Sequence, residues 1–168
     1  SSPARATTRL RALLKEPAPL ILPGCFNAMS ARILEHAGFP ALYMSGYGTS
    51  LNLLGLPDAG LITLTEMALN AKLIASAVRA PLIADADTGF GNAINVVRTV
   101  EEYIRAGVAG MHLEDQVAPK RCGHVAGREV IARDEAVLKI RAACQTRDAL
   151  DPDFVIIART DARGAHGG

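Results

Sequence analysis

Short apolar runs alternate with amphipathic stretches of helical length along the chain. Within the runs, polar and apolar residues do not alternate, so both faces of each predicted strand are expected to be covered. This rhythm is typical of an α/β fold in which helices flank parallel strands. The predicted strands are residues 20–26, 40–46, 81–87, 108–115 and 153–161.

The stretches between the runs carry signals for helix ends. Asn27 is a possible cap of the first of these helices, and Gly38 stops it. After a long loop, Thr63 or Thr65 is available to cap the next helix, and Gly107 ends the one that follows. The predicted helices are residues 27–39, 63–81, 93–107 and 132–150.

The N-terminal segment, residues 1–18, has two interpretations. It contains arginines and hydroxyl residues with no acid before Glu16, as a transit peptide would. It also has the pattern of an amphipathic helix that a threonine caps and a proline ends. We favour the helix, because no long apolar segment or cleavage site follows it.

Polar residues stand at the carboxyl ends of the predicted strands. A doubly wound sheet uses mainly the strands at its switch point, whereas in a (β/α)8 barrel all strand ends converge on one axis. The distribution therefore favours a barrel, and no GxGxxG motif follows the first strand. The strand-end residues are Ser45, Asp85, Asp87, Glu114, Asp115, Arg159 and Asp161.

The chain is shorter than a complete (β/α)8 barrel. A (β/α)8 barrel takes about 250 residues, and this chain has 168 residues with five predicted strands. We therefore expect a single domain over 1–168 that is the N-terminal part of a truncated TIM-type barrel. In this division, residues 1–18 form a helix and residues 19–168 form βα units 1–5.

Composition narrows the range of partners. There are 18 Lys and Arg against 17 Asp and Glu, and aromatic residues are only 4%, so no nucleic acid is expected. No apolar run reaches the ~20 residues that cross a bilayer, so no membrane partner is expected either. The three cysteines are odd in number and widely spaced, which indicates a reducing, cytoplasmic setting.

The stretch DADTGFGN, residues 85–92, is the most informative. Asp85 and Asp87 are two apart, so on an extended strand their carboxylates point the same way and need a cation or proton between them. Oxygen ligands without a His–Cys cluster favour magnesium over zinc. A capped turn that opens the next helix is the alternative.

Two further acids strengthen the metal interpretation. Asp58 lies in the loop after the second predicted strand, and Glu114 ends the fourth. Because Mg²⁺ takes few direct carboxylates, we expect one or two of the four acids to bind it and the others to hold its waters. In the alternative interpretation, Asp58 is a turn residue and Glu114 pairs with a Lys or Arg.

The hexapeptide PKRCGH, residues 119–124, places a thiol beside cations. Lys120, Arg121 and His124 favour a reactive Cys122 thiol, which suits a nucleophile or a general acid and base. Zinc is disfavoured, because the other two cysteines lack metal-ligand spacing and are expected to be packing residues. An inert loop cysteine is the alternative.

Two strand ends offer groups that bind anions. Arg159 can hold a substrate carboxylate through two parallel hydrogen bonds, or it can form a structural salt bridge to Glu114 or Asp161. Ser45 and the N–H groups around Gly46 offer a small anion-binding nest, or they form a simple glycine turn.

Taken in order, five motifs resemble the isocitrate lyase and phosphoenolpyruvate mutase superfamily over about residues 23–161. The motifs are SGYGTS with LGLPD, DADTGFGN, HLEDQ, PKRCGH and IARTDA. The short-chain branch, which includes methylisocitrate lyase, dimethylmalate lyase and oxaloacetate hydrolase, is the most similar. The resemblance implies a (β/α)8 barrel, a homo-oligomer that is commonly a tetramer, a small carboxylate substrate, and Mg²⁺, with Mn²⁺ as a possible substitute.

The same resemblance implies individual roles. The metal site would consist of a direct ligand, Asp85, and three residues that hold its waters, Asp58, Asp87 and Glu114. The oxo-acid site would consist of Tyr43, Ser45, Gly46 and Arg159. The general acid would be Cys122 on a gating loop over about 120–127. Arg121 and His124 would help to bind the second carboxylate and tune the thiol, and Arg159 would contact the substrate near the oxo acid during catalysis.

The implied function is a Mg²⁺-dependent lyase that cleaves a small 2-hydroxy di- or tricarboxylate into an α-oxo acid and a carboxylate. Tyr47 stands where methylisocitrate lyases carry a smaller residue, which favours a dimethylmalate- or oxaloacetate-type substrate. The alternatives are an oxaloacetate-type C–C hydrolase, a phosphonate-processing relative, and a truncated non-catalytic remnant.

Overall fold

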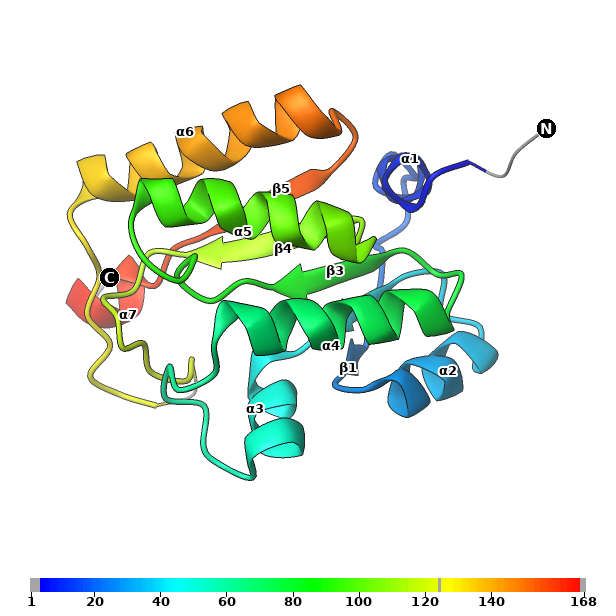
Figure 1. The fold of residues 1–168 in the computed structure, drawn as a ribbon, viewed down its shortest axis with the longest axis horizontal. Coiled ribbons are helices and arrows are strands. Elements are labelled where there is room, and N and C mark those ends of the chain that lie inside the picture. Colours follow the sequence, from blue (N-terminus) through cyan, green and yellow to red (C-terminus); the bar gives the residue numbers. More distant parts are fainter. Residues whose placement is uncertain (1–3, 124, 167–168) are drawn as a thin grey trace.

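The computed structural model describes residues 4–123 and 125–166, in which five parallel strands form one sheet with helices around it (Figure 1). The strands lie in chain order, and each is parallel to its neighbour. This confirms the predicted parallel α/β sheet. The strands are β1 (Gly24–Cys25), β2 (Leu42–Met44), β3 (Leu82–Asp85), β4 (Gly110–Glu114) and β5 (Val155–Arg159).

Helices follow the strands along the chain and cover the sheet. Three of them, α4, α5 and α6, lie side by side across the face that is turned to the viewer in Figure 1. The helices are α1 (Ala6–Leu13), α2 (Ala28–His36), α3 (Gly46–Leu54), α4 (Leu64–Ala77), α5 (Ala93–Ala106), α6 (Arg133–Leu150) and α7 (Ala162–His166).

Local capping explains where several helices begin and end. Asn27 caps α2 in a capping box with Ser30, and Thr63 caps α4 in a capping box with Glu66. Gly107 ends α5 in the left-handed conformation, with φ 85°. These ends confirm the predictions for Asn27, Thr63 and Gly107.

The long loop that was expected after the second strand is partly wrong, because Gly46–Leu54 form α3. The Ser45 hydroxyl caps this helix by accepting a hydrogen bond from the Gly48 N–H at 3.0 Å. Gly55 ends the helix with φ 64°. Two glycines in the first turn lower the intrinsic helix propensity, so the cap and tertiary contacts decide the structure here.

The N-terminal helix is confirmed as α1, but its expected threonine cap is wrong. No side chain caps it, and both threonines lie inside the helix. The Thr7 hydroxyl donates to Asp151 at 2.9 Å, and the Thr8 hydroxyl donates to Asp153 at 2.6 Å. The threonines therefore attach α1 to the loop that precedes β5.

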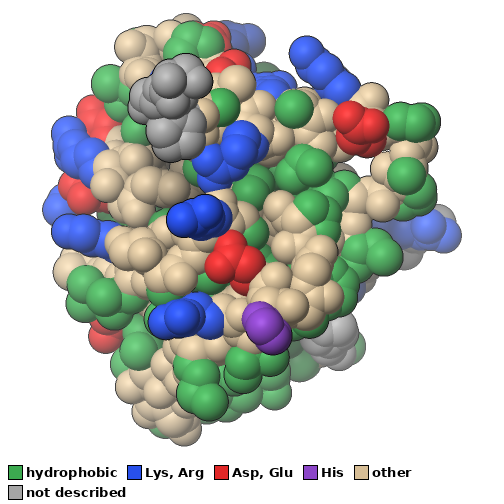
Figure 2. All heavy atoms as spheres, turned by 90° about the vertical axis from the view of Figure 1, so that its right-hand side faces the viewer, with side chains coloured by type: hydrophobic (Ala, Val, Ile, Leu, Met, Phe, Trp, Pro, Cys, Tyr) green, Lys and Arg blue, Asp and Glu red, His purple; other side chains and the backbone are tan. Residues whose placement is uncertain are grey.

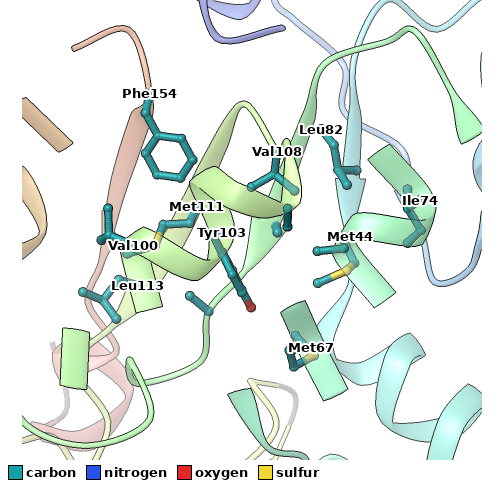
Figure 3. Close-up of a cluster of buried hydrophobic side chains, with 14 of the residues drawn as sticks. Met44, Met67, Ile74, Leu82, Val100, Tyr103, Val108, Met111, Leu113 and Phe154 are labelled. Carbon is teal, nitrogen blue, oxygen red and sulfur yellow. The ribbon is translucent and has the colours of Figure 1, made fainter. Parts of the chain in front are cut away.

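Two clusters of buried side chains lie on opposite faces of the sheet. The larger one fills the space under α4 and α5, with Tyr103, Met111 and Leu82 among its members (Figure 3). It includes Cys25, as predicted, whereas Cys144 on α6 is half-buried. The smaller cluster lies against α1 and consists of Leu10, Ala41, Ile83, Ala109 and Val155.

One side of the molecule carries charges of both signs, and none of the described helices could span a membrane. Figure 2 shows the side at the right of Figure 1, where Lys and Arg, Asp and Glu, and hydrophobic side chains are interspersed. Over residues 4–123 and 125–166, no helix combines the length and the apolar character that a bilayer span requires.

Candidate active site

The register of the sheet stacks the polar residues of one face in layers. Ile83 pairs with Gly110, and Asp85, two residues further on, pairs with His112. Glu114, two residues beyond His112, pairs with Arg159. Because side chains alternate along a strand, Asp85, His112, Glu114 and Arg159 share one face. At the amino ends of the strands this face is apolar and packs on α1. At the carboxyl ends of the strands it is polar.

Three groups fix the position of Asp85 at the end of β3. Its Oδ2 accepts the Gly46 N–H at 3.2 Å, and its Oδ1 accepts the Asp87 N–H at 2.9 Å. The buried Tyr103 hydroxyl donates to the Asp85 backbone carbonyl at 2.6 Å. A Cβ atom on residue 46 would lie only 2.6 Å from Asp85 Oδ2, so the close approach requires Gly46.

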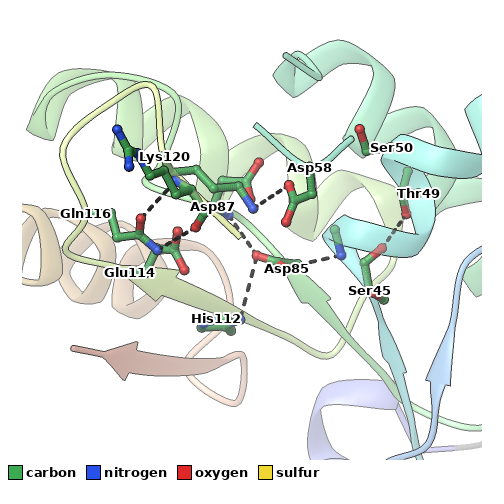
Figure 4. Close-up of polar contacts among 12 residues, drawn as sticks. Ser45, Thr49, Ser50, Asp58, Asp85, Asp87, His112, Glu114, Gln116 and Lys120 are labelled. Atoms are coloured by element: carbon green, nitrogen blue, oxygen red, sulfur yellow. Dashed lines mark hydrogen bonds and ion pairs between the residues drawn. The ribbon is translucent and has the colours of Figure 1, made fainter. Parts of the chain in front are cut away.

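The prediction that Asp85 and Asp87 extend along one strand is wrong. β3 ends at Asp85, and Asp87 has a left-handed backbone with φ 45°. This turn directs Asp87 toward Lys120, whose Nζ lies 2.8 Å from Asp87 Oδ1 and 2.6 Å from Asp58 Oδ1 (Figure 4). The three side chains are buried, so one ammonium group holds two carboxylates out of water.

Burial and mutual repulsion change the acidity of the cluster. Burial, with repulsion from Asp85, raises the pKa of Asp87 to about 6 against the opposing effect of Lys120. Burial raises the pKa of Glu114 to about 7, although Arg159 and Lys120 lower it. Burial alone would lower the pKa of Lys120, but Asp87 and Asp58 raise it above its usual value. The cluster therefore favours an additional positive charge.

The cluster offers carboxylate oxygens, which are donors that a hard cation prefers. Glu114 Oε2 lies 3.1 Å from Arg159 Nη1, whereas its buried Oε1 has no hydrogen-bond partner among the described residues. Within residues 4–123 and 125–166, no three His, Cys, Asp or Glu side chains converge as a ready-made metal cage. Oxygen donors that are few in direct reach suit Mg²⁺ better than Zn²⁺.

Tyr43 and His112 form a buried pair beside Asp85. The Tyr43 hydroxyl and His112 Nδ1 are 2.7 Å apart, and this nitrogen lies 3.7 Å from Asp85 Oδ1. Burial lowers the pKa of His112, against the effect of Asp85, so the neutral imidazole is favoured. Tyr43 and His112 therefore lie together beside Asp85, and the role of Tyr43 in an oxo-acid site stays a prediction.

Arg159 makes both of the salt bridges that were considered for it. Its guanidinium lies 3.1 Å from Glu114 Oε2 and 3.1 Å from Asp161 Oδ1. About a third of its side chain is exposed (33%). Burial alone would lower the pKa of Arg159, but Glu114 and Asp161 raise it.

The Cys122 segment, defined as Arg121–Gly123, lies next to Arg159. A Cβ atom on Gly123 would be 2.6 Å from Arg159 Nη2, so the backbone beside Cys122 packs on the guanidinium. Cys122 itself is half-buried. Lys120 points to Asp58 and Asp87, so it belongs to the carboxylate cluster. His124 lies outside the described residues, and movement of the loop stays a prediction.

The nest at Ser45 and Gly46 is already engaged in internal bonds. The Ser45 hydroxyl caps α3, and the Gly46 N–H binds Asp85. Arg121 Nη1 donates to the Ala126 carbonyl at 3.4 Å. Binding of a substrate carboxylate by these groups stays a prediction.

Sequence reasoning missed three residues of the site, namely Lys120 as a cluster member, His112 and Gln116. His112 had a readable signal, because it is two residues before Glu114 on one strand and so shares its face. Lys120 had no such signal, since its partners Asp58 and Asp87 are at distant positions in the chain. Gln116 had none either, since it binds the distant Asp161 and the backbone of Arg121 in an irregular loop.

Comparison with known proteins assigns the chain to a family. A family model described as phosphoenolpyruvate phosphomutase matches residues 10–167. The chain belongs to the phosphoenolpyruvate mutase and isocitrate lyase superfamily. This membership confirms the resemblance carried by the five motifs.

Individual members of the superfamily are similar over almost the whole chain. A 2,3-dimethylmalate lyase of Eubacterium barkeri is 54% identical over 159 residues. The structure of oxaloacetate acetylhydrolase with 3,3-difluorooxalacetate has a TM-score of 0.94 and 48% identity over 97% of the chain. A phosphonopyruvate hydrolase in complex with oxalate and Mg²⁺ has a TM-score of 0.88 and 36% identity over 98% of the chain.

The chain spans about half the length of these superfamily members. It covers 54% of the Eubacterium barkeri lyase and 56% of each of the two solved structures. The five-stranded sheet therefore matches a partial barrel of the superfamily fold.

Proposed function

We propose that the chain carries the metal site and the general acid of a Mg²⁺-dependent carbon–carbon lyase. The substrate is a small 2-hydroxy di- or tricarboxylate, and the products are an α-oxo acid and a carboxylate. The observation that supports this most is the buried carboxylate cluster with Arg159 beside it and the Cys122 segment packed on Arg159. The identity to 2,3-dimethylmalate lyase agrees with it.

In this proposal, Asp85 binds the metal directly, and Asp58, Asp87 and Glu114 hold its waters. Mg²⁺ held there would supply a Lewis acid for the substrate oxygen that becomes the carbonyl. The Mg²⁺ complex of the phosphonopyruvate hydrolase supports this ion. Mn²⁺ prefers the same oxygen donors and would substitute.

The remaining steps use side chains of the chain itself. The Arg159 side chain is partly exposed, and its guanidinium would hold a substrate carboxylate. As the C–C bond breaks, the substrate hydroxyl would give its proton to a carboxylate of the cluster and its oxygen would become the carbonyl. The electron pair of the broken bond remains as a carbanion on the departing fragment, and the Cys122 S–H bond breaks as its proton forms a C–H bond there. The thiolate that remains is stabilised by the neighbouring cations. A closed loop would keep water from the carbanion.

Replacement of the thiol tests the proposed reaction. Cys122→Ser should nearly abolish release of the α-oxo acid and leave Mg²⁺ binding intact, because the hydroxyl is a far weaker acid. Cys144→Ser, at a half-buried helix position, is the matched control and should keep the activity. Equal turnover in Cys122→Ser and in the unsubstituted chain would contradict the role of the Cys122 thiol as the general acid.

An oxaloacetate-type C–C hydrolase is the second candidate. The TM-score of 0.94 to oxaloacetate acetylhydrolase favours it, and a phosphonate-processing relative is favoured by the phosphonopyruvate hydrolase. A screen for released glyoxylate, pyruvate or oxalate separates these reactions. A binding or assembly module without catalysis is the third candidate. Absence of Mg²⁺ and oxalate binding by folded material would support that module.

We further propose a homo-oligomer. Large hydrophobic side chains are exposed on α2 and α4, among them Met29 (72%), Ile33 (57%) and Leu69 (57%). Exposed apolar residues that gather in this way favour a protein–protein contact. Sedimentation velocity would show a single assembly rather than a 17.7 kDa monomer. The tetramer and the cytoplasmic location stay predictions.

A further inference from the structure

Side chains bind the backbone on both sides of Cys122. Gln116 Oε1 accepts the Arg121 N–H at 3.0 Å, and Gln116 Nε2 donates to the Arg121 carbonyl at 3.0 Å. The amide therefore pairs with Arg121 as a neighbouring strand would. On the other side of Cys122, Arg128 Nη1 donates to the Gly123 carbonyl.

Both binding side chains meet on one carboxylate. Gln116 Nε2 also donates to Asp161 Oδ2 at 3.1 Å, and Arg128 Nε lies 3.8 Å from Asp161 Oδ1. Asp161 Oδ1 in turn pairs with Arg159 at 3.1 Å. Asp161 thus connects the Cys122 segment to the end of β5 and to the arginine that contacts Gly123.

The loop between β4 and α6, which carries the Cys122 segment, is paired at its base by backbone hydrogen bonds. Val117 N–H donates to the Glu129 carbonyl at 2.8 Å, and Ile131 N–H donates to the Asp115 carbonyl at 2.9 Å. Asp115 also accepts the Asp161 N–H at 2.9 Å. The loop is therefore closed at its base and is also held at Lys120 by the ion pairs to Asp58 and Asp87. Beyond Lys120, at the tip of the loop, side chains of Gln116 and Arg128 hold the backbone on both sides of Cys122.

We propose that Gln116 and Arg128 are positioning residues that, through Asp161, hold the Cys122 segment against Arg159. We call these three residues the latch. Gln116 is almost fully buried (1% exposed), and an amide in the middle of three hydrogen bonds is costly to release. The latch allows the tip to open without unfolding of the base. That it positions a catalytic acid rests on the proposed function, whereas the latch itself does not.

The reactivity of Cys122 toward iodoacetamide measures the latch directly. Gln116→Glu has the same shape but replaces the donor with an acceptor that faces Asp161 and the Arg121 carbonyl. We expect Cys122 to be alkylated about tenfold faster than in the unsubstituted chain, as loss of two hydrogen bonds favours the open tip. Cys144 in the same sample is the internal reference, and its rate should not change.

A second variant tests the latch from the less buried side. Arg128→Met removes the bond to Gly123 and the contact with Asp161, and it should raise the Cys122 rate several-fold. Arg128→Lys keeps the charge and should restore most of the protection. Arg133→Met, an exposed arginine in the first turn of α6, is the matched control and should leave the rate unchanged.

The buried Cys25 reports on folding in each sample. If Cys25 is also alkylated faster in Gln116→Glu, that variant has unfolded. The test of the latch then rests on Arg128→Met. Unchanged Cys122 alkylation in folded Arg128→Met would overturn the latch. Measuring the alkylation rate of Cys122 needs neither metal nor turnover. If the chain proves to have no lyase activity, faster alkylation of Cys122 in these variants would still support the latch.

Discussion

The carboxylate cluster and the Cys122 segment lie close together, yet they are held in different ways. Asp85 and Glu114 end adjacent parallel strands, and the sheet register fixes their separation. The Cys122 segment has no regular structure, and side chains from elsewhere hold its backbone. One part of the site is therefore coupled to folding, and the other can change its position while the fold persists.

The carboxylate cluster and the Cys122 segment also differ in their electrostatic interactions. The cluster gathers four buried carboxylates with Lys120 and Arg159, so its charges interact in a medium of low polarity. The Cys122 segment has mainly neutral hydrogen bonds to its backbone. Changes in the cluster should therefore alter the free energy of unfolding far more than changes in the latch do.

Lys120→Met should have the largest effect. It leaves Asp58 and Asp87 buried without their cation, which costs about 3–5 kcal/mol of unfolding free energy. Urea unfolding at pH 8 measures it, and added Mg²⁺ should recover part of the loss. Lys72→Met, at an exposed position on α4, is the control. A loss that is equal in the two variants would contradict the account.

Gly46→Ala should rank second. The new Cβ would lie 2.6 Å from Asp85 Oδ2 and displace that carboxylate, at a cost of about 1–3 kcal/mol. Mg²⁺ affinity should fall roughly 10–100-fold, as it does when the support of a ligand is lost. Gly24→Ala is the control, because a Cβ there has no neighbour within 4 Å. Unchanged Mg²⁺ affinity in Gly46→Ala would remove Asp85 from the site.

The pH dependence of stability sharpens the comparison further. Asp87 and Glu114 have raised pKa values of about 6 and about 7, so the folded chain binds their protons more tightly than the unfolded chain. Their contribution to stability is present below about pH 4 and is lost as pH rises through about 7. Without metal, the melting temperature should fall by roughly 5 °C between pH 5 and pH 8.

Two measurements isolate this effect of the cluster. The double variant Asp87→Asn with Glu114→Gln should show a flatter profile, since neither side chain titrates. Mg²⁺ at pH 8 should raise the melting temperature of the unsubstituted chain. If the melting temperature depends on pH with the same slope in the double variant and in the unsubstituted chain, groups other than Asp87 and Glu114 control the pH dependence.

Tyr103→Phe should have a smaller effect. It removes the hydrogen bond from the Tyr103 hydroxyl to the Asp85 carbonyl, which is worth about 1 kcal/mol. Tyr47→Phe, at a half-exposed position, is the control and should change little. Thermal melts compare the two, and equal melting temperatures would show that this bond does not support β3.

Arg128→Met should have the smallest effect on stability, within about 0.5 kcal/mol, because its side chain is partly exposed and the base of the loop stays paired. The same variant should nevertheless show faster Cys122 alkylation. A loss as large as that of Lys120→Met would mean that the tip and the cluster unfold together.

Local patterns were enough to predict most of the fold. The apolar runs located all five strands, and Asn27, Thr63 and Gly107 marked helix ends, because each signal acts within a few residues. The helix α3 was missed because glycines at positions 46 and 48 weaken its local signal. Its stability comes from a cap and from tertiary contacts.

The candidate site was predictable only where strand ends determine it. Asp85 and Glu114 follow from the parallel sheet alone. The left-handed backbone of Asp87 and the ion pairs of Lys120 depend on the way a distant loop returns to the sheet. Gln116 gave no pattern, since its partners are two backbone groups of Arg121 and the distant Asp161 carboxylate.

Calorimetric titration of the 168-residue chain with Mg²⁺ and oxalate at neutral pH tests the central claim most directly. The account predicts saturable binding of Mg²⁺ that oxalate strengthens, and a loss of most of the affinity in Asp85→Asn. Absence of saturable binding to cooperatively folded chain, or equal affinity in Asp85→Asn, would contradict it.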